Sequence, residues 1–181
     1  MRRTAARRNI VLFGFMGTGK TVIGREIARR LGMKFVDMDD VIEEKEACTI
    51  SQIFAQKGEK YFRKVESEVA RTFSRQEELV IATGGGVVLN RENVDALQSS
   101  GTGICLTASP EVIYGRVKHE THRPLLMTDD PLGRIRSLLQ YRDPFYATVK
   151  YRIDTSDLSV EGVIETTLDI VEKDRSVGAN T

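Results

Sequence analysis

A glycine-rich segment near the start of the chain has the residue types and spacing of a phosphate-binding loop. Residues 14–21 read Gly-Phe-Met-Gly-Thr-Gly-Lys-Thr, which matches the pattern Gly-x-x-x-x-Gly-Lys-Ser/Thr at each fixed position. The backbone N–H groups of such a loop surround phosphate oxygens at the positive end of a helix. We therefore expect Lys20 to reach the β- and γ-phosphates of a nucleoside triphosphate, and the Thr21 hydroxyl to ligate Mg²⁺.

The segments on either side of the loop supply the context that this chemistry needs. Residues 10–13 form a short apolar run, which is typical of a buried parallel strand. After the loop, apolar residues recur at helical spacing and predict a helix from Lys20 to Gly32. The alternative is a glycine-rich turn that only joins a strand to a helix, and the Lys-Thr pair disfavours it.

A cluster of carboxylates follows the next predicted strand. Residues 34–40 read Lys-Phe-Val-Asp-Met-Asp-Asp, and the carboxyl ends of parallel strands form the edge of a sheet that faces ligands. Asp37 and Asp39 should therefore emerge beside the phosphate loop, where one carboxylate can support Mg²⁺ and the other can meet a hydroxyl group. A structural alternative is that Asp39 or Asp40 caps a helix beginning at Val41.

Glycines and arginines complete the set of candidate site residues. The apolar run at 79–83 ends in a triple glycine at 84–86, which brings bare backbone to the same edge. Residues 118–130 lack periodicity and predict a mobile lid, in which Arg123 can neutralise phosphate charge on closure. Arg63 and Glu66 stand three residues apart on a predicted helix, so an exposed ion pair is an equal alternative to a functional role.

The order of elements predicts a single α/β domain. Strands near residues 9, 34, 79, 103 and 151 alternate with helices, the pattern of a three-layer αβα P-loop fold with a five-stranded parallel sheet and a mobile lid. We expect the domain to cover residues 9–175, with acceptor-binding helices over about 39–73. Further helices are predicted at 131–141 and 160–173. Residues 1–8 are expected to form a disordered basic tail, and 176–181 a frayed one.

Composition excludes several classes of protein. The formal net charge is +1, but four arginines lie in the first eight residues, and without them 23 basic residues face 26 acidic ones. No general basic field points to nucleic acid, and no apolar stretch approaches the ~20 residues of a membrane span. Cys48 and Cys105 are expected to be free thiols in a reducing cytoplasm. We expect a cytoplasmic monomer with small-molecule partners.

Taken together, these motifs resemble the shikimate kinase family of bacteria, over residues 9 to about 173. The resemblance is carried by a combination of short motifs: Asp37-Met38-Asp39; Ile53-Phe54 with Gly58-Glu59; Phe-Arg-Lys-Val-Glu at 62–66; the triple glycine at 84–86; Arg-Pro-Leu-Leu at 123–126; and Arg142 followed by Tyr146. The family resemblance implies ATP-dependent phosphorylation of the 3-hydroxyl of shikimate. The products would be shikimate 3-phosphate and ADP, on the route through chorismate to aromatic amino acids.

The resemblance also implies a role for each matching acceptor residue. Asp39 would bind the shikimate hydroxyls and act as the candidate base. Arg63 and Arg142 would hold the shikimate carboxylate, and Gly85 would contribute a backbone contact. Shikimate carries one negative charge and three hydroxyls, so two arginines and one aspartate suit it.

On the nucleotide side, the resemblance implies that Asp37 supports Mg²⁺ together with Thr21. Arg123 would close from the lid onto ATP, and Arg116 would stack against adenine. The ATP contacts are then expected from Gly17, Thr18, Gly19, Lys20, Thr21, Val22, Arg116 and Arg123. The loop at 154–160 departs from some relatives because it lacks their Arg and Pro, so adenine contacts there stay open.

Two other readings of the sequence stay open at this stage. One is a different small-molecule kinase of the same fold, such as a gluconate kinase or a nucleoside monophosphate kinase. The other is a regulatory P-loop protein, which would hydrolyse ATP without a small acceptor. The chain has no Asn-Lys-x-Asp signature for guanine, and its dispersed arginines favour a small anionic acceptor.

Overall fold

A parallel five-stranded sheet organises the computed structural model, which describes residues 8–119 and 128–178. The strands lie in the order β2-β3-β1-β4-β5, and each neighbouring pair is parallel. Their bounds are β1 (Asn9–Gly14), β2 (Lys34–Asp37), β3 (Leu79–Ala82), β4 (Gly101–Thr107) and β5 (Tyr151–Asp154). The sheet predicted from the sequence is therefore confirmed.

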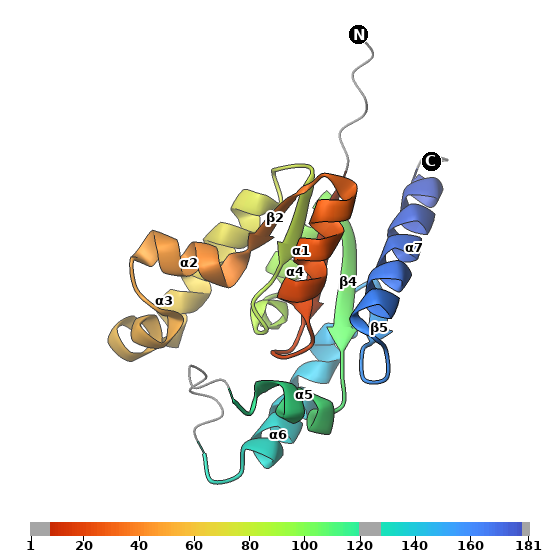
Figure 1. Ribbon diagram of the computed structural model, residues 1–181. Helices are drawn as coiled ribbons and strands as arrows, with labels where there is room; N and C mark the ends of the chain where they lie inside the picture. The colour runs from red at the N-terminus through yellow and green to blue at the C-terminus, as the bar shows by residue number, and fades with distance from the viewer. Residues whose placement is uncertain (1–7, 120–127, 179–181) are drawn as a thin grey trace.

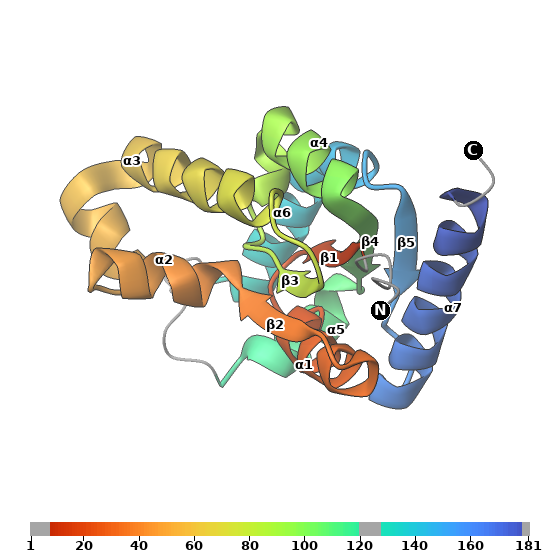
Figure 2. The same ribbon diagram turned by 90° about the horizontal axis from the view of Figure 1, so that it is seen from above.

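Helices cover both faces of this sheet (Figures 1 and 2). One layer holds α1 (Lys20–Leu31) and α7 (Val160–Gly178), and the other holds α3 (Ile50–Phe73) and α4 (Arg91–Ser100). Alternate residues of β1 serve the two layers, because Ile10 and Leu12 pack in the cluster with α1 and α7, whereas Val11 and Phe13 pack in the cluster with α3 and α4. The three-layer αβα prediction is confirmed.

The remaining elements gather at the carboxyl ends of the strands. There, α5 (Pro110–Val117) and α6 (Pro131–Tyr146) lie beyond the end of β4 (Figure 1). Helix α2 (Met38–Glu46) directly follows β2, and a short 3₁₀ turn, η1 (Val87–Leu89), follows the triple glycine. This arrangement brings the loops after β1, β2 and β3 to one edge of the sheet.

Helix α2 begins earlier than the sequence predicted. We expected a helix from Val41 capped by Asp39 or Asp40, but the cap is Asp37, whose Oδ1 accepts a hydrogen bond from the N–H of Asp39 at 3.1 Å. Met38 is fully buried in the core, which draws the chain into the helix directly after β2. Asp39 consequently lies in the first turn of α2 and not at its cap.

Helix α3 consists of two helical segments that meet at a kink at Gly58 (φ 80°, ψ 168°), which agrees with the prediction of separate helices in this region. Two other helix bounds differ from prediction. Helix α6 continues through Pro144 to Tyr146, because the burial of Arg142 and Tyr146 offsets the hydrogen bond that proline removes. Helix α7 includes residues 176–178 of the expected frayed tail, and Ser176 Oγ donates to the carbonyl of Glu172 at 2.9 Å.

Some predictions fall on residues outside the described part. Most of the predicted lid lies between the two described ranges, and Arg123 lies there with it. Within the predicted basic tail, only Arg8 is described, and its Nη2 donates to the carbonyl of Ser99 at 3.1 Å.

The described residues also bear on cysteine chemistry and membrane spans. Cys48 and Cys105 are free thiols, as expected, and burial raises the pKa of the Cys105 thiol to about 12. Among the described helices, none combines the length and the apolar character that crossing a bilayer requires.

Candidate active site

The phosphate loop is held in shape by its own side chains. Lys20 Nζ donates to the carbonyls of Gly14 and Phe15, at 2.9 and 2.8 Å, and Thr18 Oγ1 donates to the carbonyl of Phe15 at 2.8 Å. Gly19 precedes α1 with a left-handed conformation (φ 96°) that glycine adopts readily. The loop therefore presents the first turn of α1 and the lysine ammonium together, as binding of polyphosphate requires.

Two oxygen groups that we predicted to support Mg²⁺ lie in contact. Thr21 Oγ1, in the first turn of α1, donates to Asp37 Oδ2, at the end of β2, at 2.8 Å. Within the described ranges no group of three or more His, Cys, Asp or Glu side chains is arranged to hold a metal ion. Mg²⁺ nevertheless fits this pair, because it prefers hard oxygen ligands and commonly takes one or two protein oxygens, with water and substrate phosphates completing its shell.

The triple glycine is the point at which the predicted acceptor residues meet. A Cβ atom added to Gly84 would lie 2.7 Å from Asp39 Oδ1, and one added to Gly86 would lie 2.5 Å from Arg63 Nη1. One added to Gly85 would lie 3.7 Å from Arg142 Nη1 and 3.6 Å from the Met16 nitrogen in the phosphate loop. Side chains from α2, α3 and α6 thus converge beside the loop, around backbone that has no side chains of its own.

Arg63 is paired with a buried carboxylate. Its Nη1 donates to Glu66 Oε2 at 2.8 Å, and the Glu66 side chain is only 2% exposed. Burial raises the pKa of the Glu66 carboxyl, and the opposing charges of Arg63 and Arg142 do not fully cancel that effect. The alternative of an exposed ion pair is therefore wrong, because Arg63 and Glu66 lie on the side of α3 that faces the triple glycine.

Arg142 is buried beside the triple glycine. Its Nη1 donates to the carbonyl of Gly85 at 3.2 Å, and its guanidinium lies 5.5 Å from the centre of the Phe15 ring. Tyr146 OH donates to the same carbonyl at 2.7 Å, which fixes the end of α6 against the glycines.

Two buried polar atoms of this site lack a hydrogen-bond partner: Arg142 Nε and Glu66 Oε1. Buried polar groups are normally paired. A donor and an acceptor left uncommitted beside the triple glycine therefore suit a ligand that carries both a carboxylate and hydroxyl groups.

Arg116 lies on the nucleotide side of the loop. Its Nη1 donates to the carbonyl of Gly17 at 3.1 Å, and its Nη2 donates to the carbonyl of Thr155 at 2.8 Å. Thr155 follows β5 and belongs to the loop at 154–160. Arg116 thereby joins the phosphate loop to the loop after β5, where a nucleotide base is expected.

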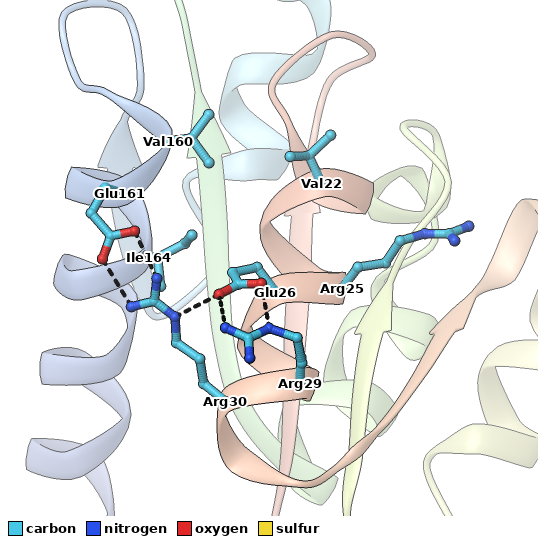
Figure 3. Close-up of a pocket in the computed structure, with 8 residues that line it drawn as sticks. All are labelled: Val22, Arg25, Glu26, Arg29, Arg30, Val160, Glu161 and Ile164. Carbon is cyan, nitrogen blue, oxygen red and sulfur yellow. Dashed lines mark hydrogen bonds and ion pairs between the residues drawn. The ribbon is translucent and has the colours of Figure 1, made fainter.

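Val22 is also among the predicted nucleotide-binding residues, and it is 59% exposed on α1. It borders an open pocket of about 570 Å³ between α1 and α7, which Figure 3 shows. Most of the charged side chains there pair with one another, since Arg30 bonds to Glu26 and to Glu161 at 2.8 and 2.7 Å. The pocket contains none of the acceptor residues, so we do not assign the chemistry to it.

Sequence reasoning missed Glu66 as a site residue and gave Tyr146 no role of its own. The spacing of Arg63 and Glu66 was visible, but the same spacing occurs in many exposed pairs. A local signal was present, because Glu66 lies at helical spacing from Phe62 and Val69 on the apolar stripe of α3.

A methyl group at position 86 is expected to weaken acceptor binding selectively. Gly86→Ala would place its Cβ within 2.6 Å of both terminal nitrogens of Arg63, so the guanidinium must move. We expect kcat/KM for the acceptor to fall about tenfold, with little change in the KM for ATP. Steady-state kinetics with each substrate varied in turn will measure this. Gly115→Ala is the matched control because no atom lies within 4 Å of its Cβ, and an equal loss in both variants would contradict the role of this close approach.

Comparison with known proteins places this geometry in one family. The model of the shikimate kinase family matches residues 16–172. Two curated shikimate kinases, from Thermodesulfovibrio yellowstonii and Caldanaerobacter subterraneus, are 48% and 47% identical to the chain over 158 residues, which is 87% of this chain and 91% and 92% of theirs. The structure of a shikimate kinase from Acinetobacter baumannii in complex with shikimate is 35% identical, with a TM-score of 0.88 over 93% of this chain and 94% of that one. The chain belongs to the shikimate kinase family.

Proposed function

We propose that this site transfers the γ-phosphoryl group of ATP to the 3-hydroxyl of shikimate, giving shikimate 3-phosphate and ADP for aromatic biosynthesis. The observation that carries the proposal is the convergence of Asp39, Arg63 and Arg142 on the triple glycine beside the phosphate loop. Family membership supports the same activity. Because these groups all come from one chain, we propose that a monomer is sufficient for activity.

The acceptor would be held by its charge and its hydroxyl groups. Arg142 and Arg63 would bind the carboxylate from two helices, which fixes the orientation of the ring. Asp39 and the backbone of Gly85 would contact the hydroxyls, and Asp39 would accept the proton of the attacking hydroxyl.

On the nucleotide side, the chain would act mainly by positioning and by neutralising charge. Lys20 would exchange its contacts with the loop carbonyls for the β- and γ-phosphates. When bound, Mg²⁺ would neutralise phosphate charge from its place beside Thr21 and Asp37. Arg116 would border the adenine, and Arg123 would add a further positive charge at the γ-phosphate.

A panel of acceptors will test this function. With ATP and Mg²⁺, we expect ADP release to depend on shikimate, and we expect gluconate, nucleoside monophosphates and acceptor-free buffer to give only background rates. A coupled ADP assay at neutral pH measures all four conditions with the same enzyme preparation. Turnover of gluconate or a nucleotide without turnover of shikimate would overturn the assignment, as would ATP hydrolysis that is independent of any acceptor.

A further inference from the structure

A carboxylate of the protein already contacts one edge of the arginine that we assign to the substrate carboxylate. Arg63 Nε and Nη2 donate to Glu59 Oε1, at 3.3 and 3.2 Å. These two N–H groups form one of the forked edges of a guanidinium, which is the geometry that takes a carboxylate in a bidentate pair. Glu59 therefore competes for an edge of Arg63 that an anionic acceptor can use.

The two acidic partners of Arg63 differ in burial. The Glu66 side chain is 2% exposed, whereas the Glu59 side chain is 64% exposed. Separating Arg63 from Glu66 would leave a charge in a medium of low dielectric constant, which is costly. Glu59 can return to water at little cost, because exposed ion pairs are weak. Glu66 is therefore the permanent partner of Arg63, and Glu59 is the exchangeable one.

The place of Glu59 in the chain also suits an exchangeable partner. Glu59 directly follows Gly58, where the helical conformation of α3 is interrupted. A Cβ atom at Gly58 would meet no atom within 4 Å, so the space around this point is open. The side chain can move away from Arg63 without displacing any part of the core.

We propose that Glu59 is a latch on Arg63, which an acceptor carboxylate must displace in order to bind. The latch holds the guanidinium in position before the acceptor arrives, and it is exchanged for a group of equal charge. A neutral polyol has no negative charge with which to replace the Glu59 carboxylate on Arg63, so the latch favours acceptors that carry a carboxylate. This inference rests on the proposed function, because it takes the carboxylate of shikimate as the competing group.

The test is the kinetics of Glu59→Gln with shikimate. The neutral amide holds Arg63 less strongly, so we expect the KM for shikimate to fall about two- to fivefold, with the KM for ATP and kcat unchanged. Glu68→Gln is the matched control, because Glu68 is a paired, exposed carboxylate on the same helix, bonded to Lys45 at 2.8 Å. The control is expected to keep the wild-type KM.

A second comparison separates the latch from a general effect of charge. In an Arg63→Gln background, whose amide can still donate to Glu66, Glu59→Gln is expected to leave shikimate affinity unchanged, measured by calorimetry. An unchanged or raised KM in Glu59→Gln alone would overturn the latch, as would an equal gain of affinity in the Arg63→Gln background. If the background variant fails to fold, the comparison with Glu68→Gln still decides. Absence of shikimate turnover by the wild-type enzyme would overturn the proposed function itself.

Discussion

Lys20→Ala is expected to lower kcat with shikimate and ATP by about 10³-fold or more. Lys20 lies in the first turn of α1. In the phosphate-loop motif, the lysine at this position contacts the β- and γ-phosphates. Its loss would remove the positive charge that we propose acts on the transferred phosphoryl group. Rapid-quench measurement of a single turnover at saturating ATP will give the effect on the chemical step.

The same substitution also removes two hydrogen bonds from Lys20 Nζ to the loop carbonyls of Gly14 and Phe15. Thermal unfolding of the variant must therefore accompany the kinetics. Arg25→Ala provides the control, because Arg25 lies on the same helix with a side chain that is 64% exposed. A loss of less than tenfold in a folded Lys20→Ala enzyme would show that the loop does not act on the transferred group.

Arg142→Ala is expected to lower kcat/KM for shikimate by about 30- to 1,000-fold, which corresponds to about 2 to 4 kcal/mol. The expected effect is large because Arg142 is only 8% exposed, so its proposed contact with a carboxylate would be made away from water. The KM for ATP should stay close to that of the wild type. Initial rates with each substrate varied separately will measure kcat/KM for shikimate and the KM for ATP independently.

Arg136→Ala is the matched control for Arg142, since Arg136 lies on α6 with a side chain that is 58% exposed and pairs with Glu111. We expect it to keep wild-type kinetics. Equal loss of shikimate and ATP affinity in Arg142→Ala would show that the residue supports the fold of the phosphate loop through Phe15 and does not recognise the acceptor.

Much of this site could be predicted from the sequence because its parts are local. The phosphate loop is contiguous, Asp37 is the last residue of β2, and the triple glycine follows β3 after one residue. In a parallel sheet, that placement is enough to bring such residues to one edge. The parallel direction of the strands followed from the alternation of strands and helices, whereas their order β2-β3-β1-β4-β5 is known only from the structure.

The parts that could not be predicted depend on contacts between distant elements. The extension of α6 through Pro144 depends on the burial of Arg142 and Tyr146 against the residues after β3. The start of α2 at Met38 depends on the burial of that side chain in the core. Local helix propensity predicts such helix bounds poorly, because tertiary packing decides where the helix begins and ends.

The burial of Glu66 against Arg63 has a consequence for how this enzyme can vary. Replacing Arg63 by a residue that cannot donate a hydrogen bond would leave the buried Glu66 carboxylate without its ion-pair partner, and breaking a buried pair in this way typically costs about 3 to 5 kcal/mol of folding free energy. Substitution of Glu66 is less costly for Arg63, which is partly exposed and keeps its contacts with Glu59. A resistance mutation that removes Arg63 to escape an anionic inhibitor would need a second change at Glu66, which narrows the routes by which resistance can arise.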